Sequence, residues 1–565
     1  MTIFQQLSRP FATPAVPTGA LNPAAPRTTA RLSGLSARSL TIAAALVTGL
    51  ILLVPAYLLY RSAGAGRQAL DTLLSVRTFA MLGTTIGLAA AVTAASTVLA
   101  VALAWLTAAT DLPGRRFWAV AAGLPLILPS YVAAYVYVSL LSPKGLVQQL
   151  LAPLGVERLP SPYGLPGAFV VLTLISYPYV LLTVRGAIQR LDPSLVEAAR
   201  SLGLTPWQAF RRVTLPHLRP SIVAGALLVA LYVLRDFGAV TMLQVNTFTR
   251  IIYNRYLGYQ LETAATLALL LVLLTVVILH LEQRTRGRAR YERLSSGAAR
   301  VRRPTPLGRW RLPALAFVAA TVFASLGLPL AGLLYWFYRG LAGQSGIALA
   351  SVEGGMSNVQ PLAGLLPAAW GSVSAGLLAA VLTAAMALPI AVLVVRRPSR
   401  RSRFFEQVAY GSFALPGIVV ALALVFAGIN LVPSLYQTMP MLLAAYAILF
   451  IPQAVGPQRA SLLQLSPGLE EAARCLGARP LGVFRRVTLP LISPGILAGA
   501  GLVFLTAMKE LPATLLLSPL GFTALSSQVW TNINEAFFAR AALPALLLLL
   551  LSSVPLALIT LKGEK

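Results

Sequence analysis

Few residues of this 565-residue chain are of types that do covalent or metal chemistry. Cys475 is the single cysteine, which excludes an internal disulfide and a cysteine metal cluster. The two histidines, His217 and His280, are too few for a histidine-based metal site within the chain. None of the four lysines follows the glycine of a GxxxxGK[ST] phosphate loop. We therefore expect no catalytic residue, no bound cofactor and no metal here, and any ATP to be used by another polypeptide.

Two pairs of adjacent charged residues stand inside long apolar runs: Arg235-Asp236 and Lys509-Glu510. An ionisable residue inside a membrane span costs a few kcal/mol, so it usually faces a partner or water. Neighbours on a helix diverge by about 100°, so each basic residue can face away from its acidic neighbour. We expect Asp236 and Glu510 to line or gate a central path, with Arg235 and Lys509 balancing their charge. The alternative is that these residues form inter-half charge pairs, salt bridges that only hold two halves of the chain together.

The chain around these pairs is apolar almost throughout. Residues of the AVILMFWYC set make up 57% of it and charged residues only 11%, and the mean hydropathy is +0.77. A soluble domain is nearer a quarter charged. The net charge of +29 could suggest nucleic acid, but the basic residues lie in short segments between apolar runs, as in membrane proteins. The composition predicts an all-α membrane protein with no nucleic-acid partner.

Twelve runs are long enough to cross a hydrocarbon core of about 30 Å as helices of about 20 residues. They lie near 40–60, 79–109, 117–141, 164–186, 220–243, 263–281, 313–337, 367–395, 405–429, 439–458, 494–517 and 541–561. With a cytoplasmic N-terminus, the alternating spans place 34 basic residues inside and nine outside, as the positive-inside rule requires. The first run lacks a small-residue cleavage site. We predict a multi-pass protein of the bacterial inner (plasma) membrane with both termini cytoplasmic.

An internal repeat divides the chain into two halves. The segments 197–216 (EAARSLGLTPWQAFRRVTLP) and 471–490 (EAARCLGARPLGVFRRVTLP) are identical at 14 of 20 positions, at an offset of 274. The same offset relates the two charged pairs. Six spans separate equivalent points, so the repeats are parallel. The predicted parts are a disordered cytoplasmic N-terminus 1–39, a first half 40–281 (core 79–281), a basic cytoplasmic linker 282–312, and a second half 313–561 (core 367–561).

Each repeated segment predicts a helix–turn–helix. Asp192 can cap a helix that Gly203 ends in a left-handed conformation. Thr205-Pro206-Trp207-Gln208 then has the capping-box pattern of a second short helix. The second copy has Ser466 and Gly477 in equivalent places, but its Arg479 is a poorer cap than Thr205, so a looser turn is expected there.

The two segments resemble the EAA signature of ABC importer membrane subunits. The matching residues are Glu197, Ala198, Ala199, Gly203, Leu215, Pro216, Glu471, Ala472, Ala473, Gly477, Leu489 and Pro490. The resemblance implies the MetI-like fold of type I importers, here as two repeats of six in about 12 transmembrane helices. It also implies that each segment docks a separate ATPase and transmits its closure. The expected partners are two ATPase copies, a periplasmic substrate-binding protein and the bilayer; a homodimer is not required because the halves are fused.

The stretches RDFGAV…NTFTRIIY and KELPATLLL…GFTALSSQVW are similar to the fused ferric iron permeases served by periplasmic iron-binding proteins. This resemblance implies ferric iron as the substrate. Thiamine is the main alternative, with polyamines and anions such as sulfate or molybdate behind it. A secondary transporter, a different class, would show no associated ATPase. Pro125, Pro129 and Pro416 are expected to kink the third spans.

Overall fold

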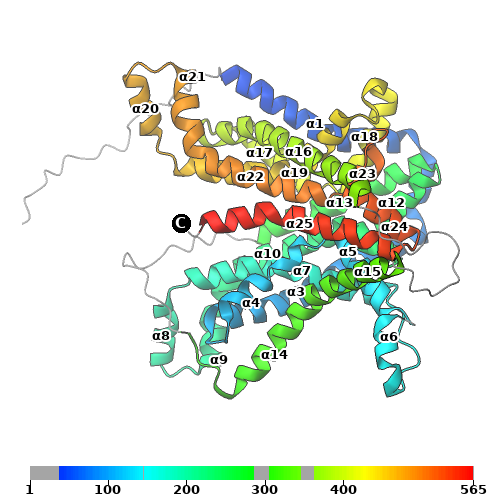
Figure 1. The fold of residues 1–565 in the computed structure, drawn as a ribbon. Helices are drawn as coiled ribbons and strands as arrows, with labels where there is room; N and C mark the ends of the chain where they lie inside the picture. Colours follow the sequence, from blue (N-terminus) through cyan, green and yellow to red (C-terminus); the bar gives the residue numbers. More distant parts are fainter. Residues whose placement is uncertain (1–36, 144, 286–303, 345–361, 564–565) are drawn as a thin grey trace, which may run out of the picture.

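The computed structural model describes residues 37–143, 145–285, 304–344 and 362–563, which are almost entirely helical. Most helices lie side by side along one direction, which is horizontal in Figure 1. Nine helices in these residues are long and apolar enough to cross a membrane, and two bent helix pairs add two more. The shorter apolar stretch Phe538–Ser553 completes the set. The expected all-α membrane fold of about twelve spans is confirmed. The N-terminal segment up to residue 36 and linker residues 286–303 lie outside the described residues.

The two halves contain equivalent series of helices. The first series is α1 (Ala37–Gly64), α2 (Arg67–Leu74), α3 (Val76–Ala109), α4 (Arg115–Ala121), α5 (Ser130–Leu141), α6 (Leu146–Leu151), α7 (Leu165–Arg190), α8 (Pro193–Ser201), α9 (Pro206–Ala209), α10 (Leu215–Arg235), α11 (Gly238–Met242), α12 (Phe248–Leu257) and α13 (Leu261–Thr285). The second is α14 (Arg311–Val322), α15 (Leu328–Gln344), α16 (Leu362–Arg396), α17 (Arg400–Gly411), α18 (Gly417–Leu431), α19 (Met439–Gln464), α20 (Pro467–Cys475), α21 (Pro480–Val483), α22 (Leu489–Lys509), α23 (Pro512–Leu517), α24 (Leu525–Asn534) and α25 (Phe538–Gly563).

The third apolar run of each half is sharply bent. The segments before and after the break meet at 97° in the first half and 107° in the second. Pro129 and Pro416 stand at the N-caps of α5 and α18 in an extended conformation. A proline lacks the backbone N–H that would continue a helix and forces its predecessor into an extended conformation. The predicted kinks are therefore nearly right-angled breaks.

The helices of the fifth runs end earlier than the spans 220–243 and 494–517 that the sequence predicts. Helix α10 ends at Arg235 and α22 at Lys509, because Asp236 and Glu510 are extended, with ψ of 129° and 123°. The chain then starts the short helices α11 and α23. Hydropathy alone cannot place such a break, since both sides of it are apolar.

The first helix of each half crosses to the other half. Helix α1 packs against α16, α17 and α18 of the second half as well as against α13. Helices α14 and α15 pack against α4 and α5 of the first half, and α15 also against α25. Figure 1 shows α1 along one side of the molecule and α14–α15 along the other. Each half is therefore completed by a helix from its neighbour.

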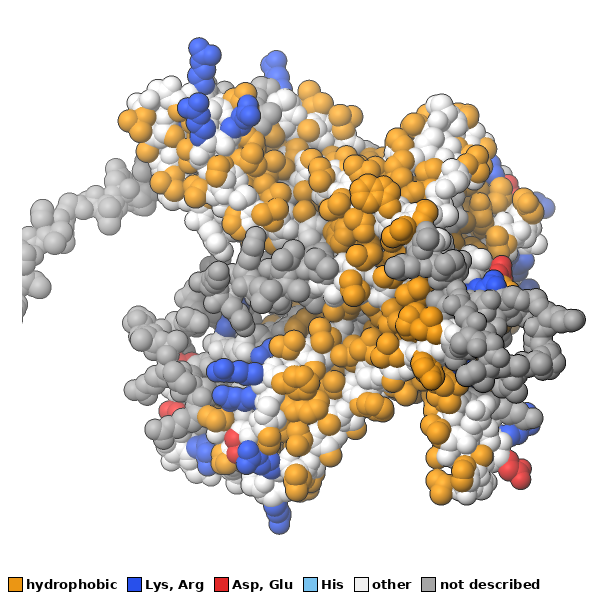
Figure 2. All heavy atoms as spheres, in the orientation of Figure 1, with side chains coloured by type: hydrophobic (Ala, Val, Ile, Leu, Met, Phe, Trp, Pro, Cys, Tyr) orange, Lys and Arg blue, Asp and Glu red, His pale blue; other side chains and the backbone are white. Residues whose placement is uncertain are grey.

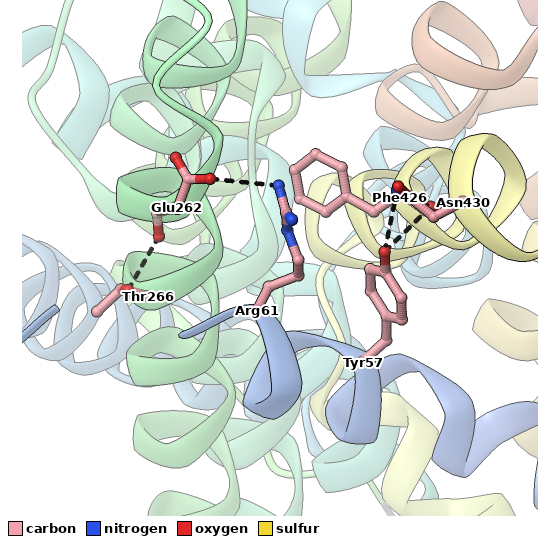
Figure 3. Close-up of polar contacts among 6 residues, drawn as sticks. All are labelled: Tyr57, Arg61, Glu262, Thr266, Phe426 and Asn430. Atoms are coloured by element: carbon pink, nitrogen blue, oxygen red, sulfur yellow. Dashed lines mark hydrogen bonds and ion pairs between the residues drawn. The ribbon is translucent and has the colours of Figure 1, made fainter. Parts of the chain in front are cut away.

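Polar contacts hold α1 in this position (Figure 3). The Arg61 guanidinium lies 3.3 Å from the Glu262 carboxylate of α13 and 5.4 Å from the centre of the Phe426 ring of α18. The Tyr57 hydroxyl donates to the Phe426 carbonyl oxygen at 3.2 Å, and the Asn430 amide donates to the Tyr57 hydroxyl at 3.2 Å. These contacts tie one helix to both halves.

The surface matches a protein that crosses a membrane. In Figure 2, apolar side chains cover the middle of the molecule, while Lys and Arg gather toward the end that carries α8, α9, α20 and α21. The start of α1 and the end of the chain lie at this same end (Figure 1). An apolar band between polar ends is the pattern that a bilayer selects.

Candidate functional site

The repeated EAA segments form the same structure twice, at the same end of the molecule (Figure 1). We call residues 193–214 the first glycine-turn segment and residues 467–488 the second. Gly203 and Gly477 have φ of 83° and 82° and end α8 and α20 in the left-handed region, where glycine carries no side-chain penalty. The next N–H in each turn, from Leu204 or Ala478, donates to the Ala199 or Ala473 carbonyl oxygen at 3.2 and 3.1 Å. The two turns match, so the looser second turn expected from Arg479 is not seen.

The predicted caps are present. The Asp192 carboxylate accepts from the Ser194 N–H at 3.0 Å, and the Ser466 hydroxyl accepts from the Gly468 N–H at 3.3 Å. Thr205 and Gln208 form the reciprocal bonds of a capping box, at 2.9 and 3.3 Å. These local bonds fix the direction in which each segment leaves the membrane-spanning bundle.

The second helix of each segment is not a separate short helix, contrary to the sequence prediction. Helix α9 runs through a π-helical turn, Phe210–Thr214, directly into α10, and α21 runs through Phe484–Thr488 into α22. The prolines of the two Leu-Pro pairs, Pro216 and Pro490, lack the N–H that an α-helical turn would use, which favours the wider turn. Motion of either segment would therefore be passed straight into a fifth span.

Both segments present the same residues to solvent. Glu197 and Ala198 are exposed, as are Glu471 and Ala472. Beside each glycine stands a leucine that is almost fully exposed: Leu202 at 85% and Leu476 at 88%. The two segments thus expose the same pair of features, a glutamate and a leucine, in equivalent places.

A buried ion-pair cluster in the second segment was missed by sequence reasoning. Glu470 is only 2% exposed. Its Oε1 lies 3.2 Å from Arg396 Nη2 and accepts from the Thr488 hydroxyl at 3.1 Å, while Arg474 lies 3.9 Å from Oε2. The first copy has Val196 at the equivalent position. This difference between two nearly identical segments was the sequence signal that could have pointed to Glu470.

The first segment is held by aromatic contacts instead. The Phe210 ring stacks on Trp207 with centroids 5.6 Å apart and meets the edge of Trp105 of α3 at 6.2 Å. The second copy has Leu481 where Trp207 stands in the first. The two segments thus share a backbone but differ in what anchors them to the bundle.

A cavity of about 320 Å³ lies between the halves, at the breaks of the third and fifth spans. Its polar lining residues are Ser130, Tyr131, Tyr179, Tyr232, Arg235 and Asp236 of the first half, and Gln453, Thr506, Lys509 and Glu510 of the second. All four charged residues singled out in the sequence therefore meet at this cavity. The two halves line the cavity with different residues at equivalent positions. The first half has Tyr179 and Tyr232, whose rings lie 5.4 Å apart. The second half has Gln453 and Thr506 there, and the Thr506 hydroxyl donates to the Gln453 amide oxygen at 2.9 Å.

The two cations reach across to the opposite half. Arg235 Nη1 donates to the Phe413 carbonyl oxygen at 3.5 Å, and Lys509 Nζ donates to the Leu126 carbonyl oxygen at 2.9 Å. Each carbonyl lies three residues before the proline that starts the bent helix of its half. The inter-half contacts are thus between a cation and a backbone dipole, and no ion pair within 4 Å joins these four described residues. Each carboxylate caps a helix of its own half, while Arg235 and Glu510, from opposite halves, remain electrostatic neighbours at more than 4 Å.

The two carboxylates cap helices. Asp236 Oδ1 accepts from the Ala239 and Val240 N–H groups at 2.9 and 3.2 Å, and Glu510 Oε1 accepts from the Ala513 N–H at 3.4 Å. A carboxylate at a helix N-terminus is favoured by the free N–H groups there. These bonds explain why the fifth spans break at an acidic residue.

Aromatic side chains cover the cavity on the side of α12 and α24. Phe237 of the first half packs on Trp530 of the second with ring centroids 5.2 Å apart, and on Tyr253 at 4.9 Å. Phe237 and Trp530 are only 2% and 4% exposed. The halves are therefore in direct contact at this level.

Comparison with known proteins agrees with this architecture. The family described as "binding-protein-dependent transport system inner membrane component" matches twice, over residues 114–287 and 362–561. The chain belongs to this family, and is a multi-pass inner-membrane permease of the ABC importer class.

Three relatives indicate the range of the family. The chain is 33% identical over 519 residues to the Fe(3+)-transport system permease protein FbpB 2 of Haemophilus influenzae, covering 91% of this chain and 96% of that protein. It is 28% identical to the probable ABC transporter permease protein y4fN of Sinorhizobium fredii, over 72% of this chain and 77% of that one. It is 30% identical to the sulfate transport system permease protein CysW of Synechocystis, over 42% of this chain and 89% of that one.

Proposed function

We propose that this permease imports ferric iron that a periplasmic binding protein delivers, driven by two copies of a separate ATPase subunit. The observation that supports the coupling most directly is the pair of glycine-turn segments. Both leave the same end of the bundle, both expose a glutamate and a leucine at the tip, and both continue without interruption into a span that lines the central cavity.

Docking at these segments would act on the cavity mechanically. Helices α10 and α22 connect the segments to Arg235 and Lys509, which hold carbonyls of the opposite half. A displacement of one segment along its helix would move a cation against the other half. This geometry supports alternating access that is driven from the segments.

The orientation follows from the charge pattern and the shared end. The glycine-turn segments, the beginning of α1 and the end of the chain lie together (Figure 1), and the segments predicted to be cytoplasmic hold 34 basic residues against nine. We infer that this end faces the cytoplasm. The α6, α12 and α24 end would then face the binding protein.

Iron is favoured by similarity along nearly the whole chain. The relative named for Fe(3+) transport is matched over 91% of this chain at 33% identity, whereas the shorter sulfate permease CysW, matched over 89% of its own length, covers 42% of this chain at 30% identity. A fused two-half chain explains why one copy would suffice for a complete pore. Thiamine and sulfate are the alternative substrates to be tested.

The test is ATP-dependent uptake into proteoliposomes that contain this chain and its cognate ATPase, with its cognate binding protein outside. Radioactive iron should accumulate only with ATP and the binding protein, and a variant that carries Gly203→Ala and Gly477→Ala should hydrolyse ATP with reduced uptake. Accumulation of thiamine or sulfate instead of iron would refute the ferric assignment. Uptake that needs an ion gradient but no ATPase would refute the coupling.

A further inference from the structure

The four charged groups at the central cavity are not equally satisfied. Asp236 accepts two backbone hydrogen bonds and Glu510 accepts one. Arg235 has five N–H donors and makes one long contact, 3.5 Å to the Phe413 carbonyl oxygen. Lys509 has three donors and makes one contact, 2.9 Å to the Leu126 carbonyl oxygen. Most of the unused charged N–H donors at the cavity therefore belong to the two cations, while Asp236 and Glu510 keep unused acceptor sites.

Tyr131 adds a third free donor. It is 2% exposed and lines the cavity, and its hydroxyl finds no hydrogen-bond partner among the described residues. A buried hydroxyl that is left without a partner costs about 1–3 kcal/mol. A group that persists in this condition at the wall of a cavity points to a ligand as its partner.

We propose that the cavity binds an oxyanion group, a phosphate or carboxylate, between Arg235 of the first half, Lys509 of the second half and the Tyr131 hydroxyl. Under the proposed function, on which this inference rests, ferric iron would pass as a complex that carries such an anion. A free oxyanionic molecule would present the same chemistry. A bare ferric ion or the cationic thiamine would be repelled by Arg235 and Lys509, and of the charged lining residues only Asp236 and Glu510, which cap helices, would offset that repulsion.

The chemistry of the three donors suits an oxyanion. A guanidinium offers parallel N–H donors to two oxygens of a phosphate or carboxylate, and an ammonium adds a point charge from the other side. The two cations come from opposite halves, so an anion between them would bridge the interface. The equivalent positions of the two walls differ, which allows the rest of the ligand to be recognised in one orientation.

The test is equilibrium binding to the full chain with its ATPase in nanodiscs. The probes are labelled ferric citrate and labelled inorganic phosphate, with thiamine as a cationic competitor. At least one anionic probe should bind, and thiamine should not compete. Arg235→Gln and Lys509→Gln each keep a donor but remove a charge, and each should raise the dissociation constant at least about tenfold. Lys509→Arg should bind nearly as the parent protein does, and Arg235→Lys, which keeps the charge but loses the parallel donors, should lose less affinity than Arg235→Gln.

Tyr131→Phe separates a ligand contact from a structural role. Because the hydroxyl has no partner in the protein, its removal should weaken binding of the anionic probe while the unfolding temperature is unchanged or rises. Binding of phosphate alone would identify a free oxyanion as the ligand, and binding of ferric citrate alone would identify the iron complex. Either result supports the site.

Two outcomes would overturn the proposal: equal binding of the anionic probe by the Arg235→Gln, Lys509→Gln double variant, or binding of neither anion, whether or not thiamine binds. The experiments distinguish failure of this site from failure of the proposed function. Absence of iron uptake with intact phosphate binding would refute ferric cargo and leave the site, whereas normal iron uptake by the double variant would refute the site and leave the cargo.

Discussion

Arg396 and Glu470 form a buried ion pair, with 3.2 Å between Nη2 and Oε1 and side chains only 9% and 3% exposed. Arg396 is the last residue of α16, and Glu470 belongs to α20 of the second glycine-turn segment. The pair therefore fastens that segment to a membrane span. The first segment has Val196 in place of the glutamate, so the two segments are anchored by different forces.

Glu470→Gln should destabilise the second half strongly. It leaves the Arg396 guanidinium buried without its counter-charge, and breaking such a pair costs about 3–5 kcal/mol. The thermal unfolding temperature of the purified chain should fall, and uptake per ATP hydrolysed should fall with it. Replacing both partners, Arg396→Met with Glu470→Val, removes the stranded charge and should restore most of the stability. A double variant as unstable as the single one would contradict this account.

The exposed leucines Leu202 and Leu476 should bind the ATPase. Leu→Asp at both positions places a charge on a surface that is expected to become buried, so co-purification of the ATPase should drop at least about tenfold. The unfolding temperature of the chain alone should not change, since both side chains are exposed. Leu520→Asp, at a leucine that is 85% exposed in the loop before α24, is the matched control and should retain the ATPase.

Gly203→Ala and Gly477→Ala should strain the two turns. No atom lies within 4 Å of the added Cβ at either position, so the penalty is the left-handed backbone alone, about 1–2 kcal/mol per site. We expect a lower ratio of substrate transported to ATP hydrolysed. Gly186→Ala, near the C-terminal end of α7 with equally open space, is the control, and an equal loss of coupling there would contradict the role of the turns.

Asp236 should act as a helix cap more than as a charge. Asp236→Asn keeps an oxygen acceptor for the Ala239 and Val240 N–H groups and should retain stability and transport. Asp236→Ala should lose about 1 kcal/mol of stability through the lost cap. Thermal unfolding and uptake, measured on the same variants, distinguish the capping role from a role of the charge. An Asn variant that is stable but does not transport would show that the path needs the negative charge.

Much of the fold follows from the sequence because membrane spans and glycine turns are local. Apolar length and basic flanks predict the helices, and Asp192, Gly203 and Thr205 predict the caps and the turn of the first segment, but not the continuation of its second helix into α10. The right-angled breaks at Pro129 and Pro416 were visible only as kinks, because the size of a bend depends on the packing around it. The exchange of α1 and α14–α15 between the halves has no local signal.

The site was predicted in composition but not in detail. The repeat identified Arg235, Asp236, Lys509 and Glu510 as equivalent residues, and the structure brings them to one cavity. Their partners could not be predicted, since the carbonyls of Leu126 and Phe413 are free only because the third spans break there. Glu470 was overlooked for a related reason: its partner Arg396 lies 74 residues away in the sequence.

The crossing of α1 and α14–α15 means that the covalent linker is not what keeps the two halves together. Each half would expose an unfilled groove without its neighbour's helix, so a chain cut between residues 286 and 303 should stay assembled through these interlocked helices. Two separately translated halves should, for the same reason, find each other in the bilayer. A gene for this chain could then be divided into two genes without loss of assembly.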